Sequence, residues 1–583
     1  MSFVSPSQPA PTLSLTAIEG ALTAIFVALS FAWPRLGSRS FAWLELRFRR
    51  LAEKRNLSVA VVGLTALFIR LAILPIHPIP IPLRPDEFSN LLAADTFCHG
   101  RLANPTPAMW VHFQSIHIDM VPTYTTMYFP GQGLVLAAGK ALFGQPWFGV
   151  MIGGAIMCSA LCWMLQAWLP ARWALLGGFL AVMRIALFSY WTSAYDSAGP
   201  ISALGGALVL GSLPRFKNGM RARHLALMST GAAILGITRP YEGLLLCIPV
   251  LVSLVYWILT VRRLPIGTLL RRAMPGVALL AVGIGWLGYY DYRAFGSPLT
   301  LPYKVDRAAY AMAPYFVWQK PRPEPDYRFA EMRRFYHVDE MNSYERVRLH
   351  PLGMTLDKFG QTVYFFAGLA LLPPLFMLPW ALRDHRIRFL VVCLLCLAAG
   401  TVIEIFLHAH YVAPFTAAFY AVGLQSIRHL YCWRPGGQSV GAAITRSVVA
   451  ICVLMVVLRV FNRQIDCPVP QQPMAAWMLS WFGPDRYVTQ RSIIEQRLMQ
   501  LPGGQLAIVR YSADHDPLDE WVYNGADIDG SKVIWARAMD DGNDQELLRY
   551  YRTRKAWLIQ PDSPSAEITP YPLPEQVTAE SSR

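Results

Sequence analysis

Residues 57–76 read LSVAVVGLTALFIRLAILPI, and the next segment, HPIPIPLRPDE, ends in Arg84-Pro85-Asp86-Glu87. The first stretch has the length and apolar character of a membrane span, since about 20 apolar residues cross the hydrocarbon core of a bilayer. The acidic pair Asp86-Glu87 therefore falls just beyond the end of a span, in water but close to lipid. A carboxylate in this position can act on a substrate whose tail stays in the membrane.

The whole chain has the composition of a polytopic membrane protein. Of its 583 residues, 54% are hydrophobic and 15% are charged, whereas soluble proteins carry about 25% charged residues. The expected fold class is an α-helical polytopic membrane protein with about 12 transmembrane helices. The twelve apolar stretches are Leu13–Trp33, Leu57–Ile76, Phe148–Leu169, Trp173–Trp191, Ile201–Leu213, Leu225–Ile237, Gly243–Leu259, Ala273–Tyr290, Val363–Leu382, Phe389–Leu407, Val412–Ile427 and Val448–Val460.

The formal net charge of +15 would indicate nucleic-acid binding in a soluble protein, but here its distribution indicates membrane topology. Residues 1–34 contain no Lys or Arg, and basic residues then gather in alternate loops, as the positive-inside rule requires of cytoplasmic loops. We expect both termini to lie outside the cytoplasm, in a bacterial inner membrane, with the first span retained as an anchor. The basic loops contain Arg35 to Arg55, Arg215 to Arg223, Arg262 to Arg272, Arg383 to Arg388, and Arg428 with Arg434.

The chain divides into three parts. Residues 1–55 form the expected anchor helix and basic cytoplasmic loop, and residues 56–462 form the transmembrane domain with outer loops 78–147 and 291–362. Residues 463–583 have the pattern of a small extracytoplasmic α/β domain, because strand-like and helix-like stretches alternate there. The expected strands are Leu506–Tyr511, Val533–Ala536 and Ala556–Ile559, and the expected helices are Ser492–Leu501 and Asn543–Arg552.

Asp86 and Glu87 have two compatible interpretations. An acidic residue directly after Pro85 can cap a short helix, where it satisfies free backbone N–H groups and the helix dipole. A carboxylate at the membrane surface can also take a proton from a hydroxyl as a general base. Asp196, the only acid in its short outer turn, is the candidate for a second acidic residue of the same site.

A leaving phosphate requires a cation, a hydrogen-bond donor or a metal to stabilise its developing charge. Arg239 and Glu242 lie in a turn between two spans, where charges are costly and usually functional, although a structural pair between them is an equal alternative. Lys304 and Arg307 lie in the long second outer loop, where a solvated surface is the simpler interpretation. The remaining candidates are His410 and Tyr411 at the start of a late span.

His408 and His410 could hold a divalent metal such as zinc, which favours His and carboxylate ligands. In an extended turn, side chains two residues apart can converge, but no further ligand in the sequence is spaced to complete a motif. A phosphate contact or a cap at the end of the span is the alternative role of these histidines. No cofactor is therefore assigned beyond a possible divalent metal.

Several short motifs occur in an order that resembles the integral-membrane glycosyltransferases of the GT-C type, which include the protein O-mannosyltransferases and the aminoarabinose transferase of lipid A. The resemblance covers roughly residues 56–430. It rests on Asp86-Glu87, Asn90-Leu-Leu-Ala-Ala-Asp95, His99-Gly100-Arg101, Tyr128-Phe129-Pro130-Gly131, Leu142-Phe143-Gly144, Phe295-Gly296-Ser297-Pro298 and His410-Tyr411-Val-Ala-Pro414.

The resemblance implies inverting transfer of a sugar from a polyprenyl-phosphate donor to an extracytoplasmic acceptor (lipid, glycan or protein), with Asp86 as the base and Glu87 beside it. This sequence departs from the pattern where relatives often carry Arg-Tyr, since it reads His410-Tyr411 there. Two other functions remain open: a transporter or flippase of a lipid-linked substrate, and an envelope assembly scaffold without catalysis. The chain shows no internal repeat of the kind that transporters usually contain.

Overall fold

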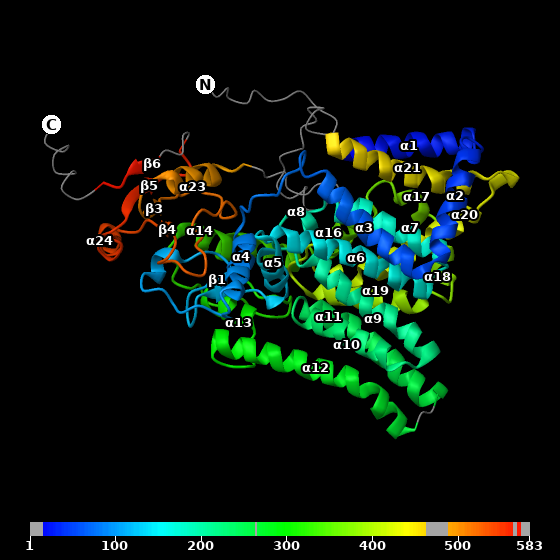
Figure 1. The fold of residues 1–583 in the computed structure, drawn as a ribbon, viewed down its shortest axis with the longest axis horizontal. Coiled ribbons are helices and arrows are strands. Elements are labelled where there is room, and N and C mark those ends of the chain that lie inside the picture. The colour runs from blue at the N-terminus through cyan, green and yellow to red at the C-terminus, as the bar shows by residue number, and fades with distance from the viewer. Residues whose placement is uncertain (1–14, 263–264, 462–487, 564–567, 573–583) are drawn as a thin grey trace.

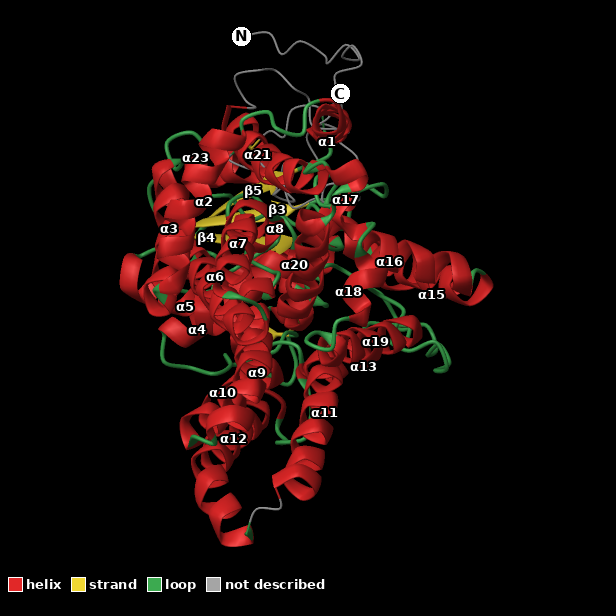
Figure 2. Ribbon diagram, turned by 90° about the vertical axis from the view of Figure 1, so that its right-hand side faces the viewer, coloured by secondary structure: helices red, strands yellow, loops and turns green. Residues whose placement is uncertain are grey.

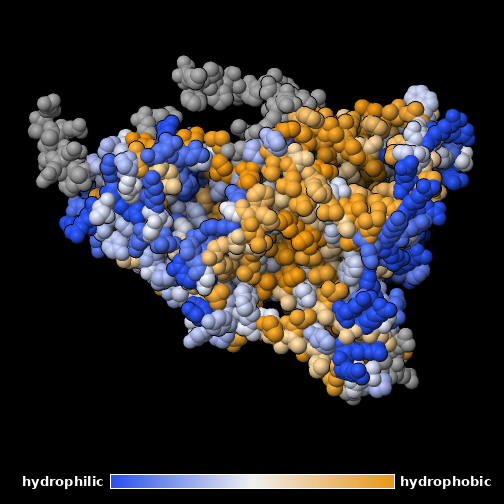
Figure 3. Space-filling view, viewed as in Figure 1, coloured by the Kyte–Doolittle hydropathy of each residue, from blue (hydrophilic) through white to orange (hydrophobic). Residues whose placement is uncertain are grey.

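The computed structural model describes residues 15–262, 265–461, 488–563 and 568–572. It confirms the expected α-helical membrane architecture with a small C-terminal α/β region. The long helices run side by side across Figure 1, and the C-terminal sheet lies at one end of them, next to α4. Figure 3 shows a broad apolar band between two hydrophilic ends, which is the surface pattern of a protein that crosses a bilayer.

The helices are bounded as follows: α1 (Leu15–Ala32), α2 (Ser38–Glu53), α3 (Arg55–Ala72), α4 (Pro85–Cys98), α5 (Pro130–Phe143), α6 (Trp147–Trp168), α7 (Ala171–Ala181), α8 (Tyr190–Ser193), α9 (Gly199–Gly219), α10 (Ala222–Gly236), α11 (Pro240–Tyr256), α12 (Ile266–Phe295), α13 (Pro302–Ala309), α14 (Ala330–Arg333), α15 (Glu340–Leu349), α16 (Pro351–Ala367), α17 (Leu372–Leu375), α18 (Leu378–Arg383), α19 (Arg388–Ile403), α20 (Thr416–Cys432), α21 (Val440–Phe461), α23 (Gln490–Gln500) and α24 (Asp541–Tyr550). Viewed from the end of the bundle, α11 and α12 project away from the main body (Figure 2).

Within the described residues, six helices have the length and apolar composition needed to cross a membrane, and α19 is a shorter apolar helix. These six correspond to six of the twelve expected spans, so the expected number is not confirmed. Several of the other stretches are broken or short. The stretch Val363–Leu382 is divided among α16, α17 and α18, because Pro373, Pro374 and Pro379 each remove a backbone donor and interrupt a helix.

The first span is fastened to the body by a buried ion pair. Arg184 lies in a π-helical turn, Val182–Ala186, which follows α7, and its Nη1 is 2.9 Å from Oε1 of Glu19 in α1. Both side chains are about 1% exposed. Two charges removed from water are tolerated when they compensate each other, which accounts for Arg184, a charge inside an expected span.

The C-terminal region confirms the expected strands and helices. β3 (Gln505–Val509) lies between β4 (Val533–Arg537) and β5 (Lys555–Ile559), parallel to both, and β6 (Ile568–Pro570) adds an antiparallel edge to β5. The predicted boundary near residue 463 lies outside the described residues. The sheet shares a hydrophobic core with the first outer loop. This core includes Leu92, Tyr124, Ile508, Ile534 and Leu547, so the C-terminal region packs directly against the helix that carries Asp86.

Candidate functional site

The start of α4 is fixed by Glu87. Pro85 occupies the first helical position, where its missing N–H costs nothing. Glu87 is fully buried, and its Oε2 accepts hydrogen bonds from the backbone N–H groups of Leu83 (3.1 Å) and Arg84 (3.2 Å), while its Oε1 accepts one from Tyr195 (3.3 Å). Both oxygens of Glu87 thus hold the turn together, so Glu87 has the helix-capping role that was one of the two interpretations of the acidic pair.

Asp86 is held differently from its neighbour. Its Oδ1 lies 3.0 Å from Nδ1 of His117 and accepts a hydrogen bond from the hydroxyl of Tyr128, whose oxygen is also 3.1 Å from the same His117 nitrogen. Within the described residues Oδ2 of Asp86 accepts no hydrogen bond, and the side chain is 30% exposed. One oxygen of the carboxylate is therefore anchored and the other is open to a ligand.

The electrostatics favour an ion pair between Asp86 and His117. Burial by itself raises the pKa of a carboxyl, but the charge of His117, the Tyr128 hydroxyl and the nearby Arg84 hold the pKa of Asp86 well below its usual range. Burial opposes the charged form of His117, yet Asp86 raises the pKa of this imidazole above its ordinary value. Asp86 is consequently an anion at neutral pH, and its charge favours the cationic form of His117.

His117 was not among the residues singled out from the sequence. It precedes a short antiparallel pair, β1 (Ile118–Asp119) and β2 (Thr125–Thr126), and it has a left-handed backbone with φ +65°, which is uncommon for a residue other than glycine. Its carbonyl oxygen accepts a hydrogen bond from the Ser89 hydroxyl (2.6 Å), and its N–H donates to the Tyr336 hydroxyl (3.2 Å). Only this tertiary arrangement brings His117 to Asp86.

Two buried carboxyls lie behind His117. The Tyr336 hydroxyl donates to Oδ1 of Asp306 (3.0 Å), and Asp306 interacts electrostatically with Asp119. Both carboxyls are almost completely buried. Burial and their mutual repulsion raise the pKa of Asp119, and burial raises that of Asp306, so that they favour the protonated form. The sequence offered no signal for this pair, since its members are 187 positions apart.

Arg239 borders the same site from the transmembrane side. It is the residue before α11, it is buried, and its guanidinium carbon lies 4.1 Å from the centre of the Tyr411 ring. Tyr411 interacts electrostatically with both Arg239 and Asp86, so Arg239, Tyr411 and Asp86 form one polar site. Glu242, in the first turn of α11, is buried and interacts electrostatically with Arg239.

Gly131 joins the Asp86 side of the site to the Arg239 side. Its N–H donates to the carbonyl of Ile237 (2.8 Å), two residues before Arg239. A Cβ added at Gly131 would lie 2.3 Å from Cγ2 of Thr238 and 2.6 Å from the Ile237 oxygen, distances that atoms do not adopt. Since Tyr128 precedes Gly131 by three residues, the absence of a side chain lets the segment that holds Asp86 rest directly on the turn that carries Arg239.

His408 and His410 stack in parallel with ring centres 5.7 Å apart. The backbone N–H of His410 donates to the Tyr190 hydroxyl (2.9 Å), whose oxygen is also hydrogen-bonded to Nδ1 of His410 (2.9 Å). Burial lowers the pKa of His408 to about 4 and that of His410 well below its ordinary value, so both rings are neutral. Among the described residues no group of three His, Cys, Asp or Glu side chains is arranged to hold a metal ion.

The remaining candidates are exposed or have other partners. Lys304 is exposed on α13, as a solvated surface predicts. Arg307 is buried, and its Nη1 forms an ion pair of 2.5 Å with Glu340, so it stabilises the second outer loop. Asp196, in the turn between α8 and α9, interacts electrostatically with Tyr190, the partner of His410.

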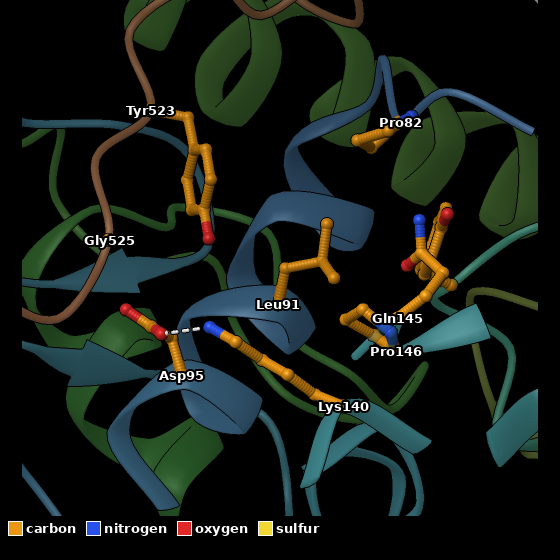
Figure 4. Close-up of a pocket in the computed structure, with 9 residues that line it drawn as sticks. Pro82, Leu91, Asp95, Lys140, Gln145, Pro146, Tyr523 and Gly525 are labelled. Atoms are coloured by element: carbon orange, nitrogen blue, oxygen red, sulfur yellow. Dashed lines mark hydrogen bonds and ion pairs between the residues drawn. The ribbon is translucent and has the colours of Figure 1, made fainter. Parts of the chain in front are cut away.

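A pocket of about 390 Å³ lies where the C-terminal domain meets α4 and α5 (Figure 4). Leu91 and Asp95 of α4 and Tyr523 and Gly525 of the C-terminal domain line it, and Lys140 of α5 forms an ion pair of 2.5 Å with Asp95. Asp95 follows Asp86 by nine positions, which places it on the opposite side of the helix. This pocket is therefore separate from the site around Asp86.

No protein-family model matches this chain, and no curated protein matches it. Solved structures of similar architecture include ArnT from Cupriavidus metallidurans in the apo state, which is 14% identical with a TM-score of 0.45 and 90% of this chain and 95% of that chain covered. ArnT bound to undecaprenyl phosphate gives 13% identity, a TM-score of 0.45 and coverage of 90% and 94%.

A further similar structure is the oligosaccharyltransferase of Archaeoglobus fulgidus in the apo form, with 10% identity, a TM-score of 0.41 and coverage of 78% of this chain and 62% of that chain. This chain thus spans less than two thirds of the length of the archaeal enzyme. The similarity is one of architecture; the chemistry of this chain rests on its own side chains.

Proposed function

We propose that this protein is a membrane glycosyltransferase that moves a sugar from a polyprenyl-phosphate donor to a hydroxyl-bearing acceptor on the outer face of the membrane. The observation that carries the proposal is the state of Asp86: an ionised carboxylate with Oδ1 fixed by His117 and Tyr128 and Oδ2 open. It lies beyond the end of a span, and Tyr411 interacts electrostatically both with it and with the buried Arg239. A base and an anion-stabilising group next to lipid suit this reaction.

In the proposed reaction the acceptor hydroxyl donates a hydrogen bond to Oδ2 of Asp86. The acceptor oxygen forms a bond to the anomeric carbon, the bond between that carbon and the phosphate oxygen breaks, and the hydroxyl proton passes to Asp86. The electron pair leaves with the polyprenyl phosphate, which gains one negative charge. A single displacement of this kind inverts the configuration of the sugar.

Arg239 is the group placed to stabilise the charge that develops on the phosphate. Its stacking on Tyr411 (4.1 Å) fixes the plane of the guanidinium, and a planar fork matches the oxygens of a phosphate. The turn that carries it begins α11, a helix whose outward side is strongly apolar, with Leu244, Leu251 and Val252 exposed. A polyprenyl tail can lie along this surface while its phosphate meets Arg239.

His117 and Tyr128 position the base. Each contacts Oδ1 of Asp86, so the carboxylate cannot turn freely and Oδ2 keeps its direction toward the acceptor. The positive charge of His117 keeps Asp86 ionised before the acceptor binds. The wall around the phosphate and sugar is shaped, and its charge balanced, by Asp196, Glu242, His410 and Tyr411.

The test is complementation of a deletion strain with the wild type, with Asp86→Asn, and with the matched control Asp326→Asn, which alters an exposed acid of the second outer loop. Envelope glycans and polyprenyl-linked sugars are profiled by mass spectrometry. The proposal expects a missing glycan and an accumulated lipid-linked sugar, restored by the wild type and the control but not by normally expressed Asp86→Asn. Full restoration by Asp86→Asn would exclude it and favour a flippase or a scaffold.

A further inference from the structure

A second polar pocket lies at the opposite end of the transmembrane bundle from Asp86. It has a volume of about 500 Å³, within the range of small-molecule sites, and its lining includes Arg55, Arg215 and Arg386 together with Gln166 and Trp168. Arg55 is the first residue of α3, whereas Asp86 lies beyond the last residue of that helix. The positive-inside rule assigns this end to the cytoplasm.

We call this hollow the arginine pocket, after Arg55, Arg215 and Arg386 in its lining. Arg215 is the arginine whose side chain is held in place by contacts with the protein. Its Nη1 donates to the carbonyl of Gly211 and its Nη2 to the carbonyl of Trp163, both at 2.7 Å. The guanidinium carbon also lies 3.9 Å from the centre of the Trp163 ring. These contacts orient the side chain, but carbonyl groups and a ring do not neutralise its charge.

The acids nearest in sequence to the other two arginines are engaged elsewhere. Glu53, two residues before Arg55, pairs with Arg49 (3.2 Å). Asp384, two residues before Arg386, accepts the backbone N–H of Arg386 (2.9 Å) and a hydrogen bond from Gln425. Within the described residues none of the three arginines of the pocket forms an ion pair, and Arg55 and Arg215 repel each other electrostatically.

Topology alone does not require this convergence. The positive-inside rule is satisfied by basic residues anywhere in a cytoplasmic loop. The three arginines here come from segments about 160 positions apart in the sequence. Three cations meet in this hollow without a carboxylate among its lining residues, and a bound anion would offset their mutual repulsion.

The surroundings of the pocket indicate a ligand at the membrane surface. Trp168 stacks on Phe389, with ring centres 6.0 Å apart, and tryptophan is enriched at membrane–water interfaces. The helix α19 begins two residues after Arg386, and its Val392 and Leu395 are exposed. The cationic hollow thus adjoins an apolar helix surface, since Phe389 of α19 contacts Trp168 of its lining.

We propose that the arginine pocket binds a phosphate group, carried by the headgroup of an anionic phospholipid whose chains lie along α19. Arginine suits this role because its fork binds phosphate oxygens in pairs. The same chemistry would accept a soluble phosphate compound, and the experiment separates the two sources. The proposal is independent of the reaction at Asp86 and concerns the other face of the membrane.

The experiment uses the purified full-length protein in detergent, with native mass spectrometry to count retained lipids after addition of phosphatidylglycerol or phosphatidylcholine. The variant is Arg55→Gln with Arg386→Gln, since both side chains are exposed; Arg215 is retained because its contacts join α9 to α6. The matched control is Arg39→Gln with Arg271→Gln, two exposed arginines outside the pocket. The same samples are repeated with excess inorganic phosphate.

We expect the wild type and the control to prefer phosphatidylglycerol over phosphatidylcholine, and the pocket variant to bind phosphatidylglycerol roughly thirtyfold more weakly. Undiminished binding in excess inorganic phosphate assigns the site to the lipid headgroup, whereas competition by phosphate assigns it to a soluble phosphate compound. Equal affinity of the pocket variant and the control overturns the proposal. If the double variant does not fold, Arg55→Gln alone gives the same comparison with a smaller decrease.

Discussion

The adjacent acids Asp86 and Glu87 provide the sharpest test of the site, because the structure gives them separate roles. Truncation by Glu87→Ala removes the acceptor of three backbone N–H groups, those of Leu83, Arg84 and Tyr195. Each donor left unsatisfied in the interior costs about 1–3 kcal/mol, so the loss of stability is at least about 3 kcal/mol. That is a large part of the about 5–15 kcal/mol that stabilises a typical domain.

Asp86→Asn is expected to behave in the opposite way. The amide keeps the size of the side chain, and the carboxylate is 30% exposed, so its ion pair with His117 is partly screened and contributes about 1 kcal/mol or less. Removal of a general base, in contrast, lowers a reaction rate by about 10²–10⁴-fold. Asp86→Asn should therefore fold normally and fail to transfer sugar.

The assay combines thermal unfolding of the purified variants in detergent with restoration of the glycan profile in the deletion strain. Glu87→Gln serves as the matched partner of Asp86→Asn, since it keeps an acceptor oxygen for Leu83 and Arg84 and should lose stability but retain transfer in the folded fraction. The assignment is refuted if folded Glu87→Gln loses transfer a hundredfold while Asp86→Asn retains it.

Three further outcomes are expected. His117→Gln should lower the thermal midpoint more at acidic than at alkaline pH. A histidine whose pKa is raised in the folded state stabilises the fold below its unfolded pKa, and this contribution disappears as the pH rises through the folded pKa. An equal decrease of the midpoint at pH 5 and pH 10 would contradict the ion pair with Asp86. Arg239→Gln should weaken retention of added polyprenyl phosphate by about tenfold to a hundredfold, which is the effect of losing a charged hydrogen bond. The control Lys304→Gln, at an exposed position, should leave retention unchanged, and native mass spectrometry measures the retained lipid in both variants. Arg537→Met should release the C-terminal domain from the outer loops and increase its cleavage in limited proteolysis, because the change breaks buried ion pairs at a cost of about 3–5 kcal/mol. Unchanged cleavage would show that the shared hydrophobic core alone holds the domain in place.

Arg537 attaches the C-terminal domain to the outer loops. Arg537, at the end of β4, has Nη2 2.7 Å from Glu520 and donates its Nε to the carbonyl of Gln114 (2.5 Å), and its Nη1 pairs with Glu331. Gln114 belongs to the first outer loop and Glu331 to the second. One buried guanidinium thus connects the domain to both segments that surround Asp86, and its burial makes the connection sensitive to the loss of any partner.

The sequence by itself determined the class of the protein and the features that depend on neighbours along the chain. Apolar stretches must be helical in lipid because their backbone groups have no other partners, and alternation of strand-like and helix-like stretches located β3, β4 and β5. Pro85 and the acids after it located the start of α4, since helix capping involves residues only a few positions apart. The order of short motifs pointed to Asp86 for the same local reason.

Only the tertiary structure decided which side chains meet. His117 reaches Asp86 because β1 and β2 fold back and a left-handed backbone turns its ring inward, and no local pattern encodes that contact. Arg307 was a candidate phosphate ligand with a solvated surface as the simpler interpretation, whereas the structure buries it against Glu340, 33 positions later. Long-range packing selects partners by distance in space, and a charge in a sequence does not reveal whether its partner will be a ligand, a neighbouring helix or water.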